Sequence, residues 1–255
     1  MSALLSFADV SVALGKTPVV EGVSFAVRAG DVVALLGANG AGKTTLLRAG
    51  LGFVRASAGS ITLDGDDPHA LSPRVRARRA AYLPQKPAAV WPIAVESIVA
   101  LGRFAHGAAP ERLGGADRAA VDAALEACGL THLRARRIDA ISGGERMRAH
   151  LARTLAQGAP LMLLDEPTAS LDPAQAIGVS DIVRAHASRG GAVVFSTHDI
   201  ALAARTASRV IVLQNGRVIA DGAPDAALSR EAIGAAYGRN GALVRIGDGV
   251  AAAFD

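Results

Sequence analysis

The run GANGAGKTT, at residues 37–45, constrains the fold of this chain more than any other part of its sequence. It matches G-x-x-x-x-G-K-[ST] and stands after a predicted strand at 31–36, at the start of a predicted helix from Lys43 to about Leu51. Glycine lacks a Cβ atom and adopts positive φ readily, so the run can wrap closely around an anion. Inward-facing N–H groups and the positive end of the helix dipole favour phosphate there. The run therefore predicts a phosphate-binding loop.

The chemistry of such a loop assigns roles to its residues. Lys43 offers a mobile positive charge to the β- and γ-phosphates, and the Thr44 hydroxyl can ligate Mg²⁺. Residue frequencies predict only about 0.003 chance matches in this chain, which disfavours the alternative of a glycine-rich turn with a surface lysine. The residues expected to bind the nucleotide here are Gly37, Asn39, Gly40, Gly42, Lys43, Thr44 and Thr45.

A second motif, PLMLLDEP at residues 160–167, is an apolar strand that ends in two adjacent carboxylates. In an open α/β sheet, side chains at the carboxyl end of a strand face the ligand crevice. We expect Asp165 to hold Mg²⁺ or its waters. Glu166 points elsewhere and is expected to accept a proton from an attacking water. The alternative is that both residues only cap the following helix.

Composition excludes several classes of protein. Apolar residues make up 51% of the chain and aromatic residues 4%, which predicts a large aliphatic core and excludes disorder as the main state. No window of about 18 unbroken apolar residues occurs, so no membrane-spanning helix is expected. The first ten residues lack a basic leader and carry Asp9, which disfavours a secretory signal. Cys128 is the only cysteine, so an intrachain disulfide and a cysteine zinc cluster are excluded. This use of cysteine fits a protein of a reducing compartment.

The charge pattern is less specific. The net charge is +4, and only 3 of the 27 basic residues are lysines. Arginines cluster at residues 74–79 and 134–137. We interpret these clusters as solvated helix faces or partner contacts rather than as sites for phosphates or acidic lipid, because a basic patch alone is weak evidence. Few aromatics are present to stack on bases, which further disfavours single-stranded nucleic acid.

The order of predicted elements indicates an α/β chain. Apolar residues alternate in the N-terminal third, helical spacing dominates from residue 84 to about 157, and strands then alternate with a helix. This alternation is typical of a parallel sheet covered by helices. The predicted strands are 4–14, 19–27, 31–36, 59–63, 161–164 and 192–196, with helices starting at Ser72-Pro73 and over 117–128, 144–157 and 173–188, and a hairpin of 209–213 with 217–220 around Asn215-Gly216. The last 30 residues give no clear prediction.

Three further motifs indicate a family. ISGGERMR at 141–148 places a serine and two glycines at a predicted helix start, SLD follows at 170–172, and STHD at 196–199. With the two motifs above, in this order along nearly the whole chain, the sequence resembles the ABC-type ATPases. The resemblance implies a P-loop NTPase (RecA-like) core with an antiparallel β subdomain over 1–83 and 158–235. It also implies a helical subdomain with the signature motif at 84–157, and a C-terminal segment at 236–255.

The resemblance also implies roles for residues that the first two motifs do not contain. Gln85 corresponds to the glutamine that meets Mg²⁺ or water and senses the transport partner, and His198 to the switch histidine that contacts the γ-phosphate. With Lys43 and Glu166 they make up the expected catalytic set. A core or surface histidine is the alternative for His198. The residues expected to close on the ATP of a second subunit are Ser142, Gly143, Gly144 and Glu145, and Asp172 is expected to cross the dimer interface.

The chain departs from the family pattern at several positions. Leu14 stands where an aromatic residue usually stacks on adenine, so either base selectivity is looser or Phe7 contributes. Glu145 replaces glutamine and adds negative charge near a phosphate. Ile141 replaces leucine, and Ala38 stands where proline is common.

The segment 81–107, and VESIVALGR within it, resembles the ATPases of iron-siderophore, haem and cobalamin importers. The implied cofactors are ATP and Mg²⁺. The implied partners are a second ATPase subunit (a homodimer), an integral-membrane permease and, indirectly, an extracytoplasmic solute-binding protein, with no nucleic acid. Trp91 is either a permease contact or ordinary core. The implied location is peripheral, on the cytoplasmic face of the inner membrane. The alternatives are a transporter for another metal or solute, and a soluble ABC ATPase of DNA repair or translation.

Overall fold

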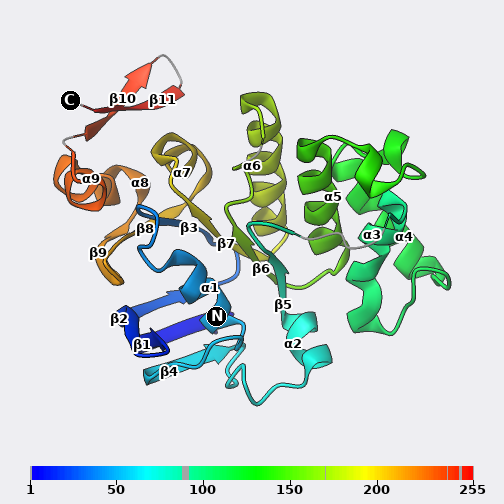
Figure 1. The fold of residues 1–255 in the computed structure, drawn as a ribbon, viewed down its shortest axis with the longest axis horizontal. Coiled ribbons are helices and arrows are strands. Elements are labelled where there is room, and N and C mark those ends of the chain that lie inside the picture. The colour runs from blue at the N-terminus through cyan, green and yellow to red at the C-terminus, as the bar shows by residue number, and fades with distance from the viewer. Residues whose placement is uncertain (1, 88–91, 170, 240, 247–248, 255) are drawn as a thin grey trace.

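A six-stranded sheet forms the centre of the molecule in the computed structural model, which describes residues 2–87, 92–169, 171–239, 241–246 and 249–254 (Figure 1). The strand order is β5-β6-β7-β3-β8-β9, parallel from β5 to β8 and closed by an antiparallel β9. The strands are β3 (Val32–Leu36), β5 (Ala80–Leu83), β6 (Leu161–Asp165), β7 (Ala192–Thr197), β8 (Arg209–Gln214) and β9 (Arg217–Gly222).

The central strands are apolar along their whole length because both faces of the sheet are covered. In β3, Val33 and Leu35 point into one core, whereas Val32, Ala34 and Leu36 point into the other. All five residues are buried. The loops at the carboxyl ends of these strands are therefore held by a sheet that is packed on two sides.

One face is covered by α1 (Lys43–Gly50) and by an antiparallel sheet of order β2-β1-β4, with β1 (Leu5–Leu14), β2 (Thr17–Val27) and β4 (Ala58–Leu63). Phe7 on β1 stacks on Phe25 of β2 with ring centroids 4.6 Å apart, and it is only 3% exposed. The expectation that Phe7 contributes to base contacts is therefore wrong, because its ring is committed to this core.

The other face is covered by helices (Figure 1). Helices α3, α4 and α5 contact one another, and α6 and α7 lie against the sheet. The helices and 3-10 turns from β4 to β8 are α2 (Pro73–Arg79), α3 (Val95–Ala100), η1 (Leu101–His106), α4 (Gly115–Ala127), η2 (Thr131–Leu133), η3 (Ile138–Ala140), α5 (Gly143–Ala156), α6 (Pro173–Ser188) and α7 (Ile200–Thr206).

Several of these helices begin where the sequence predicts. Ser72 caps α2 by accepting a hydrogen bond from the Val75 amide, and Asp172 caps α6 by accepting one from the Gln175 amide. The expected hairpin is confirmed as β8–β9, with positive φ at Asn215 and Gly216. The short strand β5 was not predicted.

The C-terminal residues add α8 (Pro224–Ala227), α9 (Arg230–Tyr237) and a hairpin of β10 (Gly241–Ile246) with β11 (Gly249–Phe254). Helices α8 and α9 contact β8, and β11 contacts α7. Ile233 and Ala236 of α9 are buried in the helical-side core. The segment thus covers the β8 side of the sheet and packs beside the turn that follows β7.

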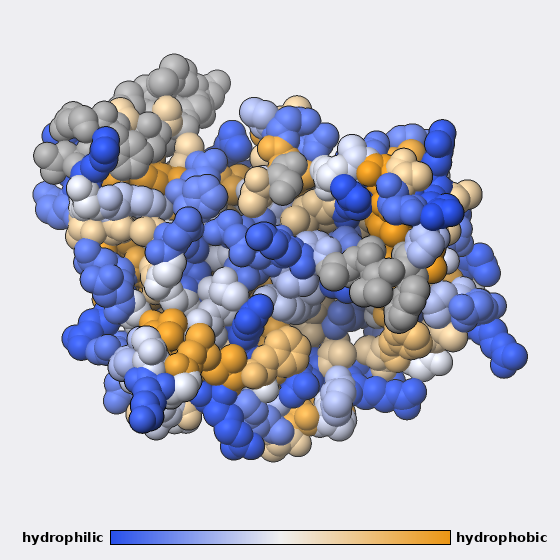
Figure 2. All heavy atoms as spheres, in the orientation of Figure 1, coloured by the Kyte–Doolittle hydropathy of each residue, from blue (hydrophilic) through white to orange (hydrophobic). Residues whose placement is uncertain are grey.

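Each arginine cluster has a member that is paired within the chain. Arg79 lies 2.7 Å from Asp66, and Arg134 lies 2.9 Å from Asp122. The interpretation of the clusters as solvated faces or partner contacts stays a prediction. Figure 2 shows hydrophilic residues spread over one face, with hydrophobic residues gathered mainly over the antiparallel sheet. Among the described residues, no helix has the length and apolarity needed to cross a membrane.

Histidine 150 predicts a pH dependence of stability. It lies in α5, is 3% exposed, and its Nδ1 has no hydrogen-bond partner among the described residues. Burial, together with the charge of Arg153, lowers its pKa to about 4, whereas the unfolded chain titrates near 6.5. Between these pH values His150 gains a proton in the unfolded state but not in the folded state. Its contribution to the free energy of unfolding is therefore complete above pH 6.5 and is lost progressively as the pH falls to about 4.

We therefore expect the free energy of unfolding to fall by about 2 kcal/mol more in the wild type than in His150→Leu between pH 7.5 and pH 5. Urea denaturation at both pH values measures the difference. The exposed His132 supplies a matched control, and His132→Leu should keep the wild-type dependence. Equal pH dependence in the wild type and His150→Leu would contradict the assignment.

Candidate functional site

The strand order brings three predicted motifs to one edge of the sheet. The chain leaves β3 into the glycine-rich loop, β6 into the two carboxylates, and β7 into the turn with His198. Strand β7 lies between the other two, with Leu36 opposite Thr197 and Asp165 opposite Ser196. Because the three strands are parallel, their carboxyl ends meet at the same edge, where ligands bind in open α/β sheets.

The glycine-rich loop needs glycine for two different reasons. A Cβ atom on Gly37 would lie 2.4 Å from the Leu213 carbonyl oxygen, so β8 leaves no room for a side chain. Gly42 adopts φ 100° at the N-cap of α1, in the left-handed region that favours glycine. No side chain caps this helix, so its first amide groups stay available to an anion.

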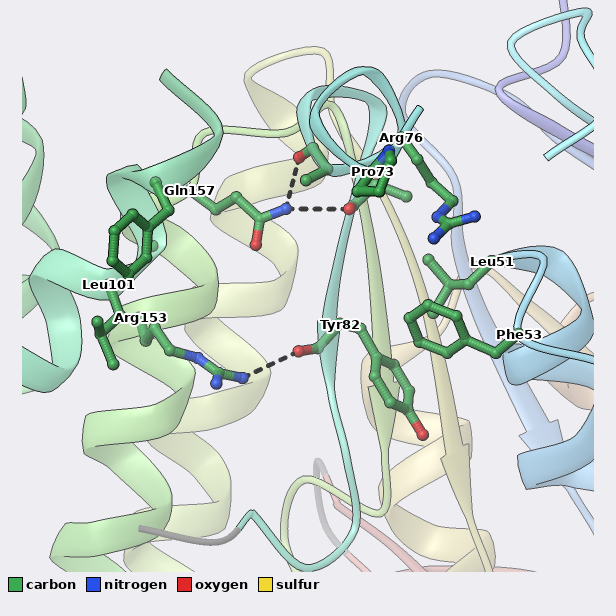
Figure 3. A pocket seen from close by; sticks show the side chains of 12 residues that line it. Leu51, Phe53, Pro73, Arg76, Tyr82, Leu101, Arg153 and Gln157 are labelled. Atoms are coloured by element: carbon green, nitrogen blue, oxygen red, sulfur yellow. Dashed lines mark hydrogen bonds between the residues drawn. The ribbon is translucent and has the colours of Figure 1, made fainter. Parts of the chain in front are cut away.

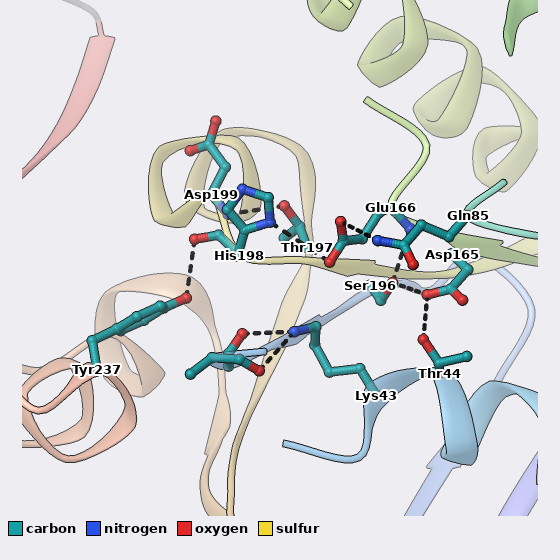
Figure 4. A network of polar contacts seen from close by, with 12 residues as sticks. Lys43, Thr44, Gln85, Asp165, Glu166, Ser196, Thr197, His198, Asp199 and Tyr237 are labelled. Carbon is teal, nitrogen blue, oxygen red and sulfur yellow. Dashed lines mark hydrogen bonds and ion pairs between the residues drawn. The ribbon is translucent and has the colours of Figure 1, made fainter. Parts of the chain in front are cut away.

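Lys43 lies inside the loop and is 6% exposed. Its Nζ donates to the carbonyl oxygens of Gly37 at 2.7 Å and Ala38 at 3.1 Å (Figure 4). Burial lowers the pKa of this ammonium group, and the charges of Glu166 and Asp165 act in the opposite direction. The ammonium group is therefore held inside the loop, among the residues that are expected to bind phosphate.

A cavity of about 300 Å³ lies over the loop. Gln85 and Glu166 line it from the other strands, and Val19 of β2 lines it from the antiparallel sheet. Sequence reasoning missed Val19, because nothing local marks an apolar strand residue as a neighbour of the loop. The remaining lining residues are Asn39, Gly40, Ala41, Gly42, Lys43, Thr44 and Thr45.

The two residues predicted to hold Mg²⁺ through hydroxyl and carboxylate oxygens are in direct contact. The Thr44 hydroxyl donates to Oδ1 of Asp165 at 3.0 Å, although the two residues are far apart in the chain. Both are hard oxygen ligands, and Mg²⁺ bound with a nucleotide needs only one or two protein carboxylates beside phosphate oxygens and waters. The donor set therefore fits this ion.

Ser196 completes this contact, and the sequence analysis gave it no role of its own. Its hydroxyl donates to Oδ1 of Asp165 at 2.6 Å and accepts from the Glu166 amide at 2.9 Å. It is fully buried. A serine inside the apolar run AVVFST was the available signal, because a buried hydroxyl in a central strand requires a partner.

Glu166 faces away from Asp165 because its backbone is left-handed, with φ 47°. Its carboxylate accepts from Nε2 of Gln85 at 3.0 Å, and Nδ1 of His198 lies 3.6 Å from its other oxygen (Figure 4). The structure thus brings together Gln85, Glu166 and His198 beside the phosphate loop. A carboxylate in this position can orient and deprotonate a water at the end of a bound phosphate chain.

The signature residues lie elsewhere. Ser142 caps α5 and forms a capping box with Glu145, whose carboxylate accepts from the Ser142 amide at 2.8 Å. Hydrogen bonds from the Ser142 backbone and side chain lower the pKa of Glu145. None of Ser142, Gly143, Gly144 and Glu145 lines the cavity over the loop, and α5 stands apart from α1 (Figure 1).

The remaining predicted residues are scattered. Asp172 caps α6, and Leu14 is half exposed at the end of β1. Trp91 and Ser170 lie outside the described residues, so the expected permease contact of Trp91 stays a prediction. The other histidines serve elsewhere: ring nitrogens of His69, His106 and His186 contact backbone carbonyls, His132 is exposed and His150 is buried.

Comparison with known proteins agrees with this geometry. Residues 20–169 match the model of the ABC transporter family. The chain belongs to that family. The hemin import ATP-binding protein HmuV of Pseudomonas entomophila is 42% identical over 229 residues, covering 88% of each chain. The cobalamin import ATP-binding protein BtuD of Halobacterium salinarum is 42% identical over 235 residues, although this chain spans only 58% of that relative's length.

Solved ABC structures share the fold. An ATP-binding subunit of an ABC transporter superposes with a TM-score of 0.78 at 28% identity, covering 87% of this chain and 90% of that one. A structure assigned to a metal-chelate type ABC transporter in an inward-facing conformation gives a TM-score of 0.84 at 26% identity, covering 100% and 97%. The family resemblance and the fold class drawn from the sequence are confirmed.

The hydrogen bonds of Ser196 predict that replacing it lowers both stability and the rate of ATP hydrolysis. Ser196→Ala leaves the buried Glu166 amide without its hydroxyl partner and removes one of the two hydroxyl donors to Asp165. We therefore expect a loss of about 1–3 kcal/mol in stability and a lower rate of ATP hydrolysis. Thermal unfolding and a phosphate-release assay measure the two effects.

Ser180 is a matched control, since it is equally buried but pairs with Thr206 away from the site. Ser180→Ala should lose stability and keep its kcat. Full activity in Ser196→Ala would contradict the assignment.

Proposed function

We propose that this chain is the ATP-hydrolysing subunit of an ABC importer for an iron-siderophore, haem or cobalamin. The observation that carries the ATPase part is that Lys43, Thr44 and Glu166 line one cavity. Asp165 accepts a hydrogen bond from Thr44, and His198 lies beside Glu166. The solute class is supported by the names of the relatives, which are hemin and cobalamin import ATP-binding proteins, and by the resemblance of residues 81–107 to such ATPases.

In the proposed mechanism the loop amides and Lys43 hold the phosphates of ATP. Thr44, Asp165 and Gln85 would hold Mg²⁺, which would supply positive charge to offset the negative charge of the phosphates. Glu166 accepts the proton of the attacking water, in the orientation that its left-handed backbone and Gln85 give it. His198, beside that carboxylate, contacts the γ-phosphate.

The site is completed by a second copy of the chain. Ser142 and Gly143 are exposed at the start of α5 and remote from the loop of their own chain. A helix start with free glycine amides suits a phosphate, so this surface is proposed to close on the nucleotide of the partner subunit. Hydrolysis then couples γ-phosphate chemistry to a rigid-body motion of two subunits.

Glu166→Gln tests the base and the dimer together. The amide keeps the hydrogen-bonding shape but cannot accept a proton, so we expect hydrolysis to fall by about 10²- to 10⁴-fold. Nucleotide binding should remain, and size-exclusion chromatography with ATP and Mg²⁺ should show an accumulated dimer. The double variant Glu166→Gln/Ser142→Arg is the control, because a bulky cation at the signature should keep the subunits apart. A variant with wild-type steady-state hydrolysis would count against the base.

A second cavity supports a permease contact. It has a volume of about 500 Å³ and lies between α2, η1, α5 and β5 (Figure 3). Phe53 and Phe104 are 55% and 54% exposed on its walls, and the Arg76 guanidinium lies 5.3 Å from the centre of the Phe53 ring. Tyr82, an edge-on neighbour of Phe53, precedes Gln85 by three residues. We propose that a cytoplasmic segment of the permease docks here, which places the subunit on the cytoplasmic face of the membrane.

Phe53→Ser and Phe104→Ser test this groove. Aromatic side chains that anchor an interface contribute about 1–3 kcal/mol when buried by a partner, so we expect weaker co-purification with a polytopic permease. Permease-stimulated hydrolysis should fall while the basal rate stays unchanged. Ile219→Ser, an exposed apolar residue on β9, is the matched control. Undiminished stimulation in both phenylalanine variants, or co-purification with nucleic acid instead of a permease, would overturn the proposal.

A further inference from the structure

The last helix of the folded core reaches the catalytic edge of the sheet. Tyr237 is the final residue of α9, and its hydroxyl donates to the backbone carbonyl oxygen of His198 at 3.0 Å (Figure 4). The two residues are separated by 39 positions in the sequence. Neither the phosphate loop nor the carboxylate motif predicts this contact.

The carbonyl that Tyr237 binds needs an external donor. His198 stands just before Asp199, the N-cap of α7, so its carbonyl lies outside the intrahelical hydrogen bonds. On the other side of the turn, the Thr197 hydroxyl accepts from the Asp199 amide at 3.0 Å, and Asp199 accepts from the Leu202 amide at 2.9 Å. Residues 197–199, which lead from the end of β7 into α7, are called the switch turn below. Tyr237, on α9, therefore restrains the switch turn from outside its own segment of the chain.

The turn that Tyr237 contacts lies beside the phosphate loop. Leu36 is opposite Thr197 in the pairing of β3 with β7, so Gly37 and His198 follow the ends of neighbouring strands. A phenol hydroxyl is protonated at neutral pH and can donate a hydrogen bond. Burial, followed by the charge of Asp199, raises the pKa of Tyr237 further.

Tyr237 is held by the sheet rather than by a mobile loop. Nε2 of Gln214, at the end of β8, donates to the Ala235 carbonyl in the last turn of α9. Ile233 and Ala236, which lie close to Tyr237 along the helix, are buried in the core. The position of the hydroxyl is therefore fixed relative to β8, whose Leu213 carbonyl also packs against Gly37.

We propose that Tyr237 is a positioning residue for hydrolysis: it fixes the backbone of His198 relative to Gly37, so that the imidazole faces Glu166 and the terminal phosphate. The inference rests on the ATPase mechanism proposed above. It gives the C-terminal segment a role in the reaction, because α9 supplies the hydroxyl that contacts the backbone of His198.

Tyr237→Phe removes the hydroxyl and keeps the ring that packs on the core. We expect kcat for ATP hydrolysis to fall about 3- to 10-fold, the range that corresponds to one neutral hydrogen bond, with KM and the Kd for ATP unchanged within about twofold. Ser229→Ala is the matched control, since it removes the hydroxyl that caps the start of α9 without touching the switch turn. It should lower the melting temperature and leave kcat at the wild-type value.

A double-variant cycle separates positioning through His198 from a general effect. Single-turnover hydrolysis with the protein in excess is measured for His198→Ala and for His198→Ala/Tyr237→Phe, and the two rates should be equal. Unchanged kcat in Tyr237→Phe, a parallel change in KM, or an additive loss in the double variant overturns the inference while leaving the proposed function in place. A fully active His198→Ala overturns both the switch role and the inference.

Discussion

Hydrogen bonding at the carboxyl edge of the parallel sheet is the constraint on which the site depends. Strand β7 separates the strand of the phosphate loop from the strand of the carboxylates, a gap of two strand spacings or about 10 Å. The hydroxyls of Ser196 and Thr44 both reach Asp165 across this gap. The parallel register of β6 and β7 sets Ser196 beside Asp165. In another register the Ser196 hydroxyl would not reach Asp165, and this hydrogen bond at the site would be lost.

Two adjacent carboxylates acquire different environments through backbone conformation. Asp165 ends a strand and stays in the sheet, 1% exposed, where it faces hydroxyl groups. Glu166 turns into the left-handed region, at a cost of about 1 kcal/mol or more for a residue with a side chain, and faces Gln85 and His198. The Ser196 hydroxyl that accepts from the Glu166 amide stabilises this turn. The geometry therefore gives the two carboxylates the different surroundings that their proposed roles, a cation ligand and a base for water, require.

Local signals predicted much of this protein, and the failures have physical causes. The glycine-rich loop, the capped helices and the Asn215-Gly216 hairpin depend on residues close in sequence, so their patterns could be recognised. Strand β5 has four residues, too few to show a period, and its pairing with β6 is long-range. Phe7 cannot be told from a base contact by local pattern, because its stacking on Phe25 joins two different strands. Val19 and Tyr237 carry no local signal, because their proximity to Gly42 and His198 arises from tertiary packing alone.

The sequence by itself determined the family, the ABC transporter family, and supplied the motifs from which the site is proposed: a glycine-rich loop, an Asp-Glu pair, the ISGGERMR run and His198. These motifs are short, and their chemistry is contained in adjacent residues. Only the tertiary structure decided which groups meet: that Ser196 joins Asp165 to Glu166, that the signature lies apart from the cavity, and that the C-terminal helix reaches the switch turn. The physical reason is that strand order and helix packing, which depend on contacts between distant residues, set the distances over which a hydroxyl or carboxylate can act.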